Sequence, residues 1–151
     1  MNVEQKLEEM GLELPPPSRP MGQYVPAVRA GNLVFLSGHG PSGAARRTLG
    51  KVGRDLTVEQ GYEAAKSVAL ALLASLKGEI GDLDRVRRVV KVLGMVNCTE
   101  DFYQQPAVIN GASDLLRDVF GEHGRHARSA IGVAALPLGS PVEVELVAQF
   151  R

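Results

Sequence analysis

The residues best suited to chemistry lie near the C-terminus, in residues 128–145. Arg128 carries a planar guanidinium that can donate two parallel hydrogen bonds to a carboxylate, a geometry that lysine does not offer. Glu143 is a possible general base, because partial burial or a neighbouring charge can raise the pKa of a glutamate toward working pH. If this protein handles a small-molecule substrate, we expect residues 128–145 to hold part of its site.

Both side chains also have plain structural interpretations. Arg128 could form a salt bridge at the surface or at an interface, and such exposed pairs contribute little to stability. Glu143 could lie on the solvated face of a strand or pair with Arg128 across a sheet. Residue type alone leaves these alternatives open.

The other reactive residue types give weaker signals. Cys98 is the one cysteine of the chain, which excludes an intrachain disulfide, and we expect it to fill apolar space at the end of a strand. His39 and His126 have no partner visible in the sequence, so neither is assigned a catalytic role. The scattered histidines lack the close spacing of paired metal ligands, so no metal site is expected.

Composition limits the partners that the chain could have. The 17 basic residues balance the 17 acidic ones, so the chain lacks the long-range positive field that non-specific binders of nucleic acids and anionic membranes use. The longest apolar stretch, residues 68–76, is too short to span a bilayer, and the N-terminal residues show no secretion-signal pattern. We therefore expect a cytoplasmic protein with neither membrane nor nucleic-acid partners.

Apolar residues at helical spacing predict three helices. A short helix is expected over residues 3–10, and a core helix follows the capping box at residues 57–60 and ends near Gly81. A second core helix is expected from Pro106 to residue 120, because proline suits a first helical turn. Thr99 could cap this next segment.

Strand-like runs are predicted at residues 24–30, 33–37, 85–96, 129–135 and 142–150. Gly31-Asn32 between the first two runs predicts a β-hairpin. In the last run, alternation places Glu143 and Glu145 on the face opposite Val142 and Val144. Residues 38–54 are rich in glycine and have no period, which predicts a long flexible loop.

The order ββ, helix, β, helix, ββ predicts an α+β two-layer sandwich, with a mixed, mostly antiparallel sheet and two helices on one face. The first and last strands are free to pair. Residues 1–20 are interpreted as an N-terminal helix and a proline-rich tether, and residues 21–151 as a single domain. The mixed character of the uncovered sheet face predicts a symmetric homo-oligomer.

Three separated blocks resemble the Rid family, the reactive-intermediate deaminases that are also called YjgF-like proteins or endoribonuclease L-PSP. The blocks are Gly22-Gln23-Tyr24, Ala30-Gly31-Asn32-Leu33-Val34-Phe35-Leu36-Ser37-Gly38, and Ala127-Arg128-Ser129-Ala130 with Leu136-Pro137 and Val142-Glu143-Val144-Glu145. They follow one another in the family's order. The resemblance implies a chorismate-mutase-like fold and a homotrimer with ligand clefts between neighbouring subunits.

The resemblance also implies an activity. Deaminating members hydrolyse an enamine or imine, made from an amino acid by a pyridoxal-phosphate enzyme, to a 2-keto acid and ammonia, as in 2-iminobutanoate/2-iminopropanoate deaminases, and they use no cofactor. By this resemblance, Arg128 would clamp the substrate carboxylate and Glu143 would position or activate the water. Tyr24, Ser37 and Asn110 would line the cleft.

Several departures indicate a divergent subgroup. Ala130 stands where deaminating members commonly carry a cysteine, and the N-terminal helix and the long basic loop of residues 38–54 are not typical of them. The alternative is therefore a non-catalytic protein that binds small carboxylate metabolites. Endoribonuclease or translation-inhibitor action ranks below both, because the net charge is zero and no catalytic histidine pair is evident.

Overall fold

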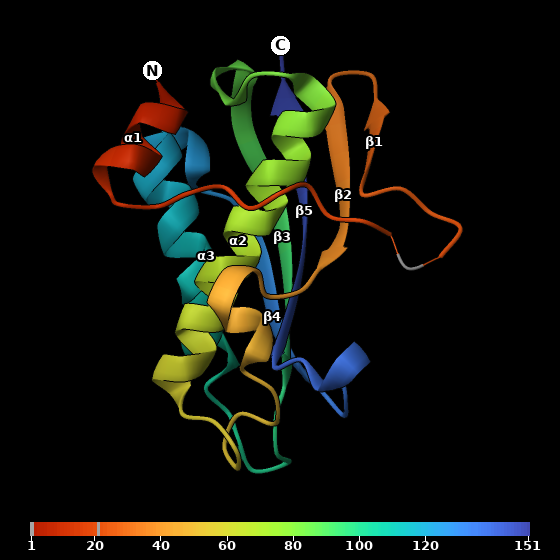
Figure 1. Ribbon diagram of the computed structural model, residues 1–151, viewed down its shortest axis with the longest axis vertical. Coiled ribbons are helices and arrows are strands. Elements are labelled where there is room, and N and C mark those ends of the chain that lie inside the picture. Colours follow the sequence, from red (N-terminus) through yellow and green to blue (C-terminus); the bar gives the residue numbers. More distant parts are fainter. Residues whose placement is uncertain (1, 21) are drawn as a thin grey trace.

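A five-stranded sheet with two long helices on one face forms the molecule (Figure 1). The computed structural model describes residues 2–20 and 22–151. The strands lie in the order β1-β2-β5-β3-β4, and every neighbouring pair is antiparallel except β3 with β4. Their bounds are β1 (Ala27–Ala30), β2 (Leu33–His39), β3 (Val86–Asn97), β4 (Ala127–Val133) and β5 (Val142–Phe150). The predicted α+β sandwich with a mixed, mostly antiparallel sheet is confirmed.

Helices α2 (Val58–Ile80) and α3 (Gln105–Phe120) cover the same face of the sheet (Figure 1). The capping box of Thr57 and Gln60 is present at the start of α2, as predicted. The two helices approach closely at Gly111, where a Cβ atom would collide with the backbone carbonyl of Tyr62. No helix among residues 2–20 and 22–151 combines the length and hydrophobicity that crossing a membrane requires.

The hydrophobic core fills the space between the helices and the sheet. β5 alternates as expected, so Val142 and Val144 are buried beneath the helices while Glu143 and Glu145 lie on the uncovered face, which we call the open face. Burial of the apolar side of this sheet against the helices is the main stabilising contribution. The largest fully buried side chains include Phe120, Leu72, Leu73, Leu76, Leu83, Ile109, Leu115 and Leu116.

The N-terminal helix α1 (Val3–Glu9) packs onto this same core. Val3 and Leu7 are buried in it, and the Val3 amide donates to Asp84 Oδ1 at 2.8 Å. Residues 11–20 then run without regular structure across the outer side of α2, where Pro17 lies against Gly78 (Figure 1). Met21, where the domain was predicted to begin, lies outside the described residues, so the division at residue 21 stays a prediction.

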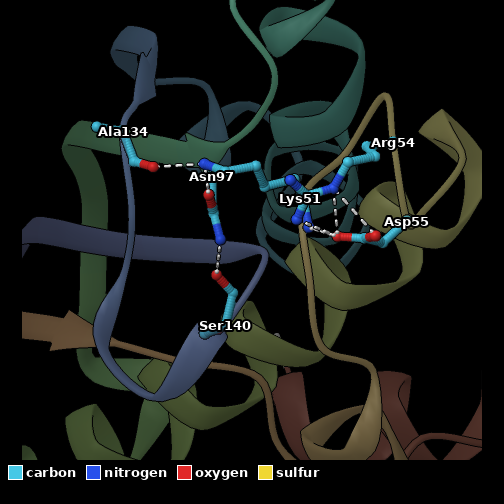
Figure 2. Close-up of polar contacts among 6 residues, drawn as sticks. All are labelled: Lys51, Arg54, Asp55, Asn97, Ala134 and Ser140. Carbon is cyan, nitrogen blue, oxygen red and sulfur yellow. Dashed lines mark hydrogen bonds and ion pairs between the residues drawn. The ribbon is translucent and has the colours of Figure 1, made fainter.

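The segment from residue 38 to residue 54 contains more regular structure and more hydrogen bonds than the predicted long loop. β2 extends to His39, a 3₁₀ helix forms at Gly43–Arg47, and Ser42 bonds to Ser67 through its amide (3.2 Å) and its hydroxyl (2.6 Å). Lys51 then reaches across to Asn97 at the end of β3, with a distance of 2.8 Å between Nζ and Oδ1, and to the Ala134 carbonyl (Figure 2). These long-range bonds supply order that the local sequence does not indicate.

Thr99 does not cap α3. The residue before the helix is Gln104, whose side chain makes no capping bond, and the buried hydroxyl of Thr99 has no hydrogen-bond partner among the described residues. Pro106 lies in the first turn of α3, as predicted. The first turn of α3 is therefore stabilised by the fixed backbone angle of Pro106 and by tertiary packing, and not by a side-chain cap.

Candidate functional site

Helix α3 holds the guanidinium of Arg128. β4 pairs with β3 so that Arg128 lies opposite Val92, whose side chain is buried beneath the helices, and Arg128 therefore points to the helix-covered face. Its Nη1 atom donates to Asn110 Oδ1 at 2.8 Å and to Ser113 Oγ at 3.1 Å. The structure thus brings together two residues of the predicted site, Arg128 and Asn110.

His126 joins this group through Ser113. Its Nε2 atom lies 2.9 Å from Ser113 Oγ, and its Nδ1 atom lies 2.7 Å from the carbonyl oxygen of Gly124. Burial lowers the pKa of His126, as does the positive charge of Arg128, although the bond to Gly124 opposes this shift. Sequence reasoning left His126 without a role. The available signal was its position two residues before Arg128 at the start of a strand, which puts both side chains on one face.

A shallow hollow opens beside Arg128. Its other charged groups are largely paired: Arg117 lies 3.4 Å from Asp118, and Arg125 lies 3.4 Å from Glu122. Arg128 has no carboxylate within 4.0 Å among the described residues, so the alternative of a salt bridge within the chain does not apply to it. The hollow is lined by Ser113, Asp114, Arg117, Gly124, Arg125, His126 and Arg128.

Glu143 lies on the open face, away from Arg128. It pairs with Met95 on β3, and its carboxylate lies directly over Gly38, where a Cβ atom would come within 2.9 Å of Glu143 Cδ. Burial raises the pKa of Glu143, and the nearby negative charge of Glu145 raises it further. A carboxylate perturbed in this direction is suited to accepting a proton from water.

Ser37 and Tyr24 belong to the side of the sheet formed by β1 and β2. Ser37 Oγ donates to the carbonyl of Val25 at 2.7 Å, and the Ser37 amide donates to Pro26 at 2.9 Å. Tyr24 directly precedes these residues, and 51% of its surface is exposed. The Ser37 side chain is therefore positioned by the contact between β2 and the segment before β1.

His39 fixes the irregularity in β2 that carries Ser37 and Gly38. Only 3% of its surface is exposed, its Nδ1 atom lies 2.6 Å from the Ser37 carbonyl, and its Nε2 atom lies 2.7 Å from Ser75 Oγ on α2. Burial lowers its pKa. We interpret His39 as a buried structural residue that ties β2 to α2.

The predicted site residues fall into two groups that one chain does not bring together. Arg128 and Asn110 lie at the β4 edge on the helix-covered face, whereas Glu143 lies on the open face of β5. Ser37 is on β2, three strand positions from β4, which is roughly 14 Å at the usual strand spacing. Within one chain, the two groups therefore lie on different parts of the sheet and do not form one site.

A family model described as "YjgF/chorismate mutase-like, putative endoribonuclease" matches residues 4–150. The chain belongs to this family. The protein TCP17 of Trypanosoma cruzi is 42% identical over 151 residues, covering 99% of this chain and 94% of that protein.

Solved structures of the YjgF-like family share the fold. A protein of unknown function from Agrobacterium tumefaciens is 40% identical, with a TM-score of 0.92, 99% of this chain covered and 92% of the other. A protein from Shewanella oneidensis, which carries the same endoribonuclease description, is 34% identical, with a TM-score of 0.95, 99% of this chain covered and 100% of the other. Because these matches cover 99% of this chain, they include most of the N-terminal helix and tether.

The structure also places two residues that were singled out in the sequence. Ala130 lies on the helix-covered face and packs partly buried against the core. Cys98 is buried, with 9% of its surface exposed, and fills space at the end of β3, as predicted. Among residues 2–20 and 22–151, no group of three or more His, Cys, Asp or Glu side chains could hold a metal ion.

Proposed function

We propose that this protein hydrolyses enamine or imine intermediates of amino-acid metabolism to a 2-keto acid and ammonia, without a cofactor. The observation that carries the proposal is the state of Arg128. Its guanidinium is held from one side by Asn110 and Ser113 and faces a hollow, with no carboxylate of the described chain to neutralise it. A small carboxylate substrate would supply the missing negative charge.

The chemistry needs an oriented water and a proton carrier. Arg128 holds the substrate carboxylate, and the ionised Glu143 takes a proton from water as its oxygen adds to the imine carbon. The imine nitrogen enters protonated, so the carbinolamine so formed is neutral and its nitrogen accepts the proton from Glu143. The carbon–nitrogen bond then breaks, and ammonia leaves as the hydroxyl returns its proton to Glu143 and the carbonyl of the keto acid forms. The raised pKa of Glu143 suits it to both the base step and the acid step.

A homotrimer with the site between neighbouring copies accommodates the geometry. Arg128 and Glu143 face opposite sides of one sheet, so we assign them to different subunits of each site. The open face supports such packing, because Val28, Phe35 and Ile131 on it are between 45% and 53% exposed. We place the activity in the cytoplasm, where it would meet imines released by pyridoxal-phosphate enzymes.

A coupled assay tests this function. A pyridoxal-phosphate threonine dehydratase generates the imine, and its decay is followed with wild type, Arg128→Ala and the control Arg54→Ala, which alters an exposed arginine paired with Asp55. We expect faster decay with wild type and with Arg54→Ala, and solvent-rate decay with Arg128→Ala. Solvent-rate decay with wild type, across imines from several amino acids, would contradict the deaminase.

Non-catalytic binding of small carboxylates is the second candidate, and Ala130 favours it, because the usual thiol is missing beside the arginine. It predicts that 2-oxobutanoate raises the melting temperature of wild type but not of Arg128→Ala, without any acceleration of imine decay. Endoribonuclease action is the least favoured candidate. To test it, the protein is incubated with single-stranded RNA at low and at moderate salt. RNA that stays intact under both conditions would exclude endoribonuclease action.

A further inference from the structure

The hydrogen atoms around Ser113 can be assigned from the acceptors that surround them. The Gly124 carbonyl can only accept, so His126 Nδ1, at 2.7 Å, carries the proton of the neutral imidazole. His126 Nε2 is then an acceptor, and the Ser113 hydroxyl donates to it across 2.9 Å. The remaining lone pairs of Ser113 Oγ face Arg128, whose Nη1 donates at 3.1 Å. Arg128 therefore donates a hydrogen bond to Ser113, and Ser113 donates one to His126.

These hydrogen bonds leave one edge of the Arg128 guanidinium free to bind a ligand. Nη1 makes both protein bonds, to Asn110 and Ser113, while Nη2 and Nε of Arg128 have no protein acceptor among the described residues. Nη2 and Nε together form the edge that binds a carboxylate through two parallel bonds. An arginine fixed at Nη1 loses less side-chain entropy when it binds a ligand through this edge.

We propose that His126, acting through the Ser113 hydroxyl, is a positioning residue that orients the Arg128 guanidinium for a carboxylate ligand. This inference rests on the proposed function, because it assigns a role at the same carboxylate site. His126 does not touch the substrate. It determines which way the Ser113 proton points and so whether Ser113 can accept from Arg128.

The sign of the pH dependence separates positioning from simple electrostatics. A proton on Nε2 turns His126 into a donor toward Ser113, so the hydroxyl oxygen then faces two cations whose mutual repulsion weakens the bond that orients Arg128. Affinity for a carboxylate should therefore fall as pH decreases through the pKa of His126. A second positive charge near Arg128 would by itself raise that affinity, which is the opposite sign.

Other charged groups lie near His126, so the experiment must separate the effect of His126 on affinity from theirs. Asp114 and Arg117 of α3 line the hollow, as do Arg125 before β4 and Arg128 on it. Asp114 accepts a 2.7 Å bond from Tyr62, whose pKa it raises to about 12, so Tyr62 does not titrate near neutral pH. Glu143 of a neighbouring copy would titrate in every variant, so only the difference between wild type and a His126 variant is assigned to His126.

The test measures the Kd of 2-oxobutanoate by calorimetry, from about pH 5 to about pH 8, because histidine titrates in this range. His126→Leu removes the acceptor, His126→Gln keeps an acceptor that does not titrate, and Ser113→Ala removes the connecting hydroxyl. His123→Gln, which alters an exposed histidine near the same hollow, is the matched control. Melting temperatures of all variants are measured in parallel to detect loss of folding.

Near neutral pH, we expect His126→Leu and Ser113→Ala each to raise Kd about tenfold, the loss typical of one hydrogen bond to a charged group. The double variant should lose no more affinity than either single variant, because both changes break the same series of hydrogen bonds. His126→Gln should stay close to wild type near neutral pH and lose the weakening that wild type shows at acid pH. His123→Gln should behave as wild type.

Three results would overturn this inference alone. One is a wild-type Kd for His126→Leu while Arg128→Ala still abolishes binding, which would leave the carboxylate site itself intact. Another is full additivity of Ser113→Ala and His126→Leu. The third is tighter binding by wild type at acid pH that is absent in His126→Gln. If wild type does not bind 2-oxobutanoate at all, the carboxylate site and this inference both fail.

Discussion

Arg128 and Glu143 point to opposite faces of the same sheet. Arg128 lies opposite buried Val92 and bonds to α3, whereas Glu143 lies opposite Met95, three residues further along β3, on the face that no helix covers. Side chains alternate along a strand, so an odd separation along β3 puts the two on different faces. The alternative of a bridge between Arg128 and Glu143 across the sheet is therefore excluded within one chain.

This geometry predicts complementation between two inactive variants. Arg128→Ala and Glu143→Gln should each lose deaminase activity alone. Subunits unfolded, mixed in equal amounts and refolded together should regain about a quarter of wild-type activity, because one site in four of a randomly mixed cyclic trimer joins an intact Arg128 to an intact Glu143.

Mixing without unfolding is the control, because intact oligomers should regain little activity. Failure of the refolded mixture to exceed either variant, when refolded wild type recovers fully, would mean that both residues act from the same subunit or that one of them is not needed.

Much of the fold follows from the sequence. The β-hairpin at Gly31-Asn32, the capping box of α2 and the alternation of β5 are local signals, and each is found in the structure. The parallel pairing of β3 with β4 has no local signal, because it depends on where α3 returns the chain. The order in residues 38–54 was missed for a similar reason, since it comes from contacts such as Lys51 with Asn97.

The site was only partly predictable. The face of Glu143 followed from alternation along β5, but the face of Arg128 depended on the register between β3 and β4. The role of Ser113 could not be seen, because a serine in the middle of an amphipathic helix gives no signal until its neighbours in space are known. His126 was dismissed because its partner lies on α3 and not beside it in the sequence.

Glycine at position 38 gives the Glu143 carboxylate its space. A Cβ atom there would come within 2.9 Å of Glu143 Cδ, and the backbone φ of Gly38 is not positive, so alanine fits the strand but displaces the carboxylate. We expect Gly38→Ala to keep the fold and to lower kcat about a hundredfold or more, as for a displaced general base.

Gly40→Ala is the matched control, because its Cβ atom would meet only Ser140 Oγ, at 3.9 Å. Circular dichroism and steady-state kinetics on both variants check the prediction. Equal kcat values for the two variants would show that the position of Glu143 does not limit the reaction.

Glu145 should influence the pH dependence through Glu143. Burial and the charge of Glu145 both raise the pKa of Glu143, so the base becomes protonated, and activity falls, at a higher pH than for an ordinary glutamate. Glu145→Gln removes the second cause and should move the acidic limb of kcat/KM to lower pH by a few tenths of a unit, because Glu145 is solvent-exposed and screened. A limb that moves to higher pH would contradict Glu143 as the base. Glu59→Gln, at the distant start of α2, should leave the limb in place.

Asn97 should contribute strongly to stability, because its hydrogen bonds connect three segments at the end of β3. Its side chain accepts from Lys51 Nζ at 2.8 Å and donates to the Ser140 carbonyl at 3.2 Å (Figure 2). Its main-chain amide donates to the Pro141 carbonyl at 2.9 Å. The residue is buried, with 4% of its surface exposed. Asn97→Ala removes both side-chain bonds and leaves the Ser140 carbonyl without this donor, so we expect a loss of about 2 kcal/mol in the free energy of unfolding.

Urea denaturation measures this loss in the free energy of unfolding. Arg54→Ala is the control, because the Arg54 side chain bonds to exposed Asp55 and its removal should leave the midpoint unchanged (Figure 2). If Asn97→Ala unfolds at the wild-type midpoint, the side-chain bond from Lys51 does not hold residues 48–56 against the sheet, and the order of this segment must come from its backbone contacts to Asn97 and Gly139.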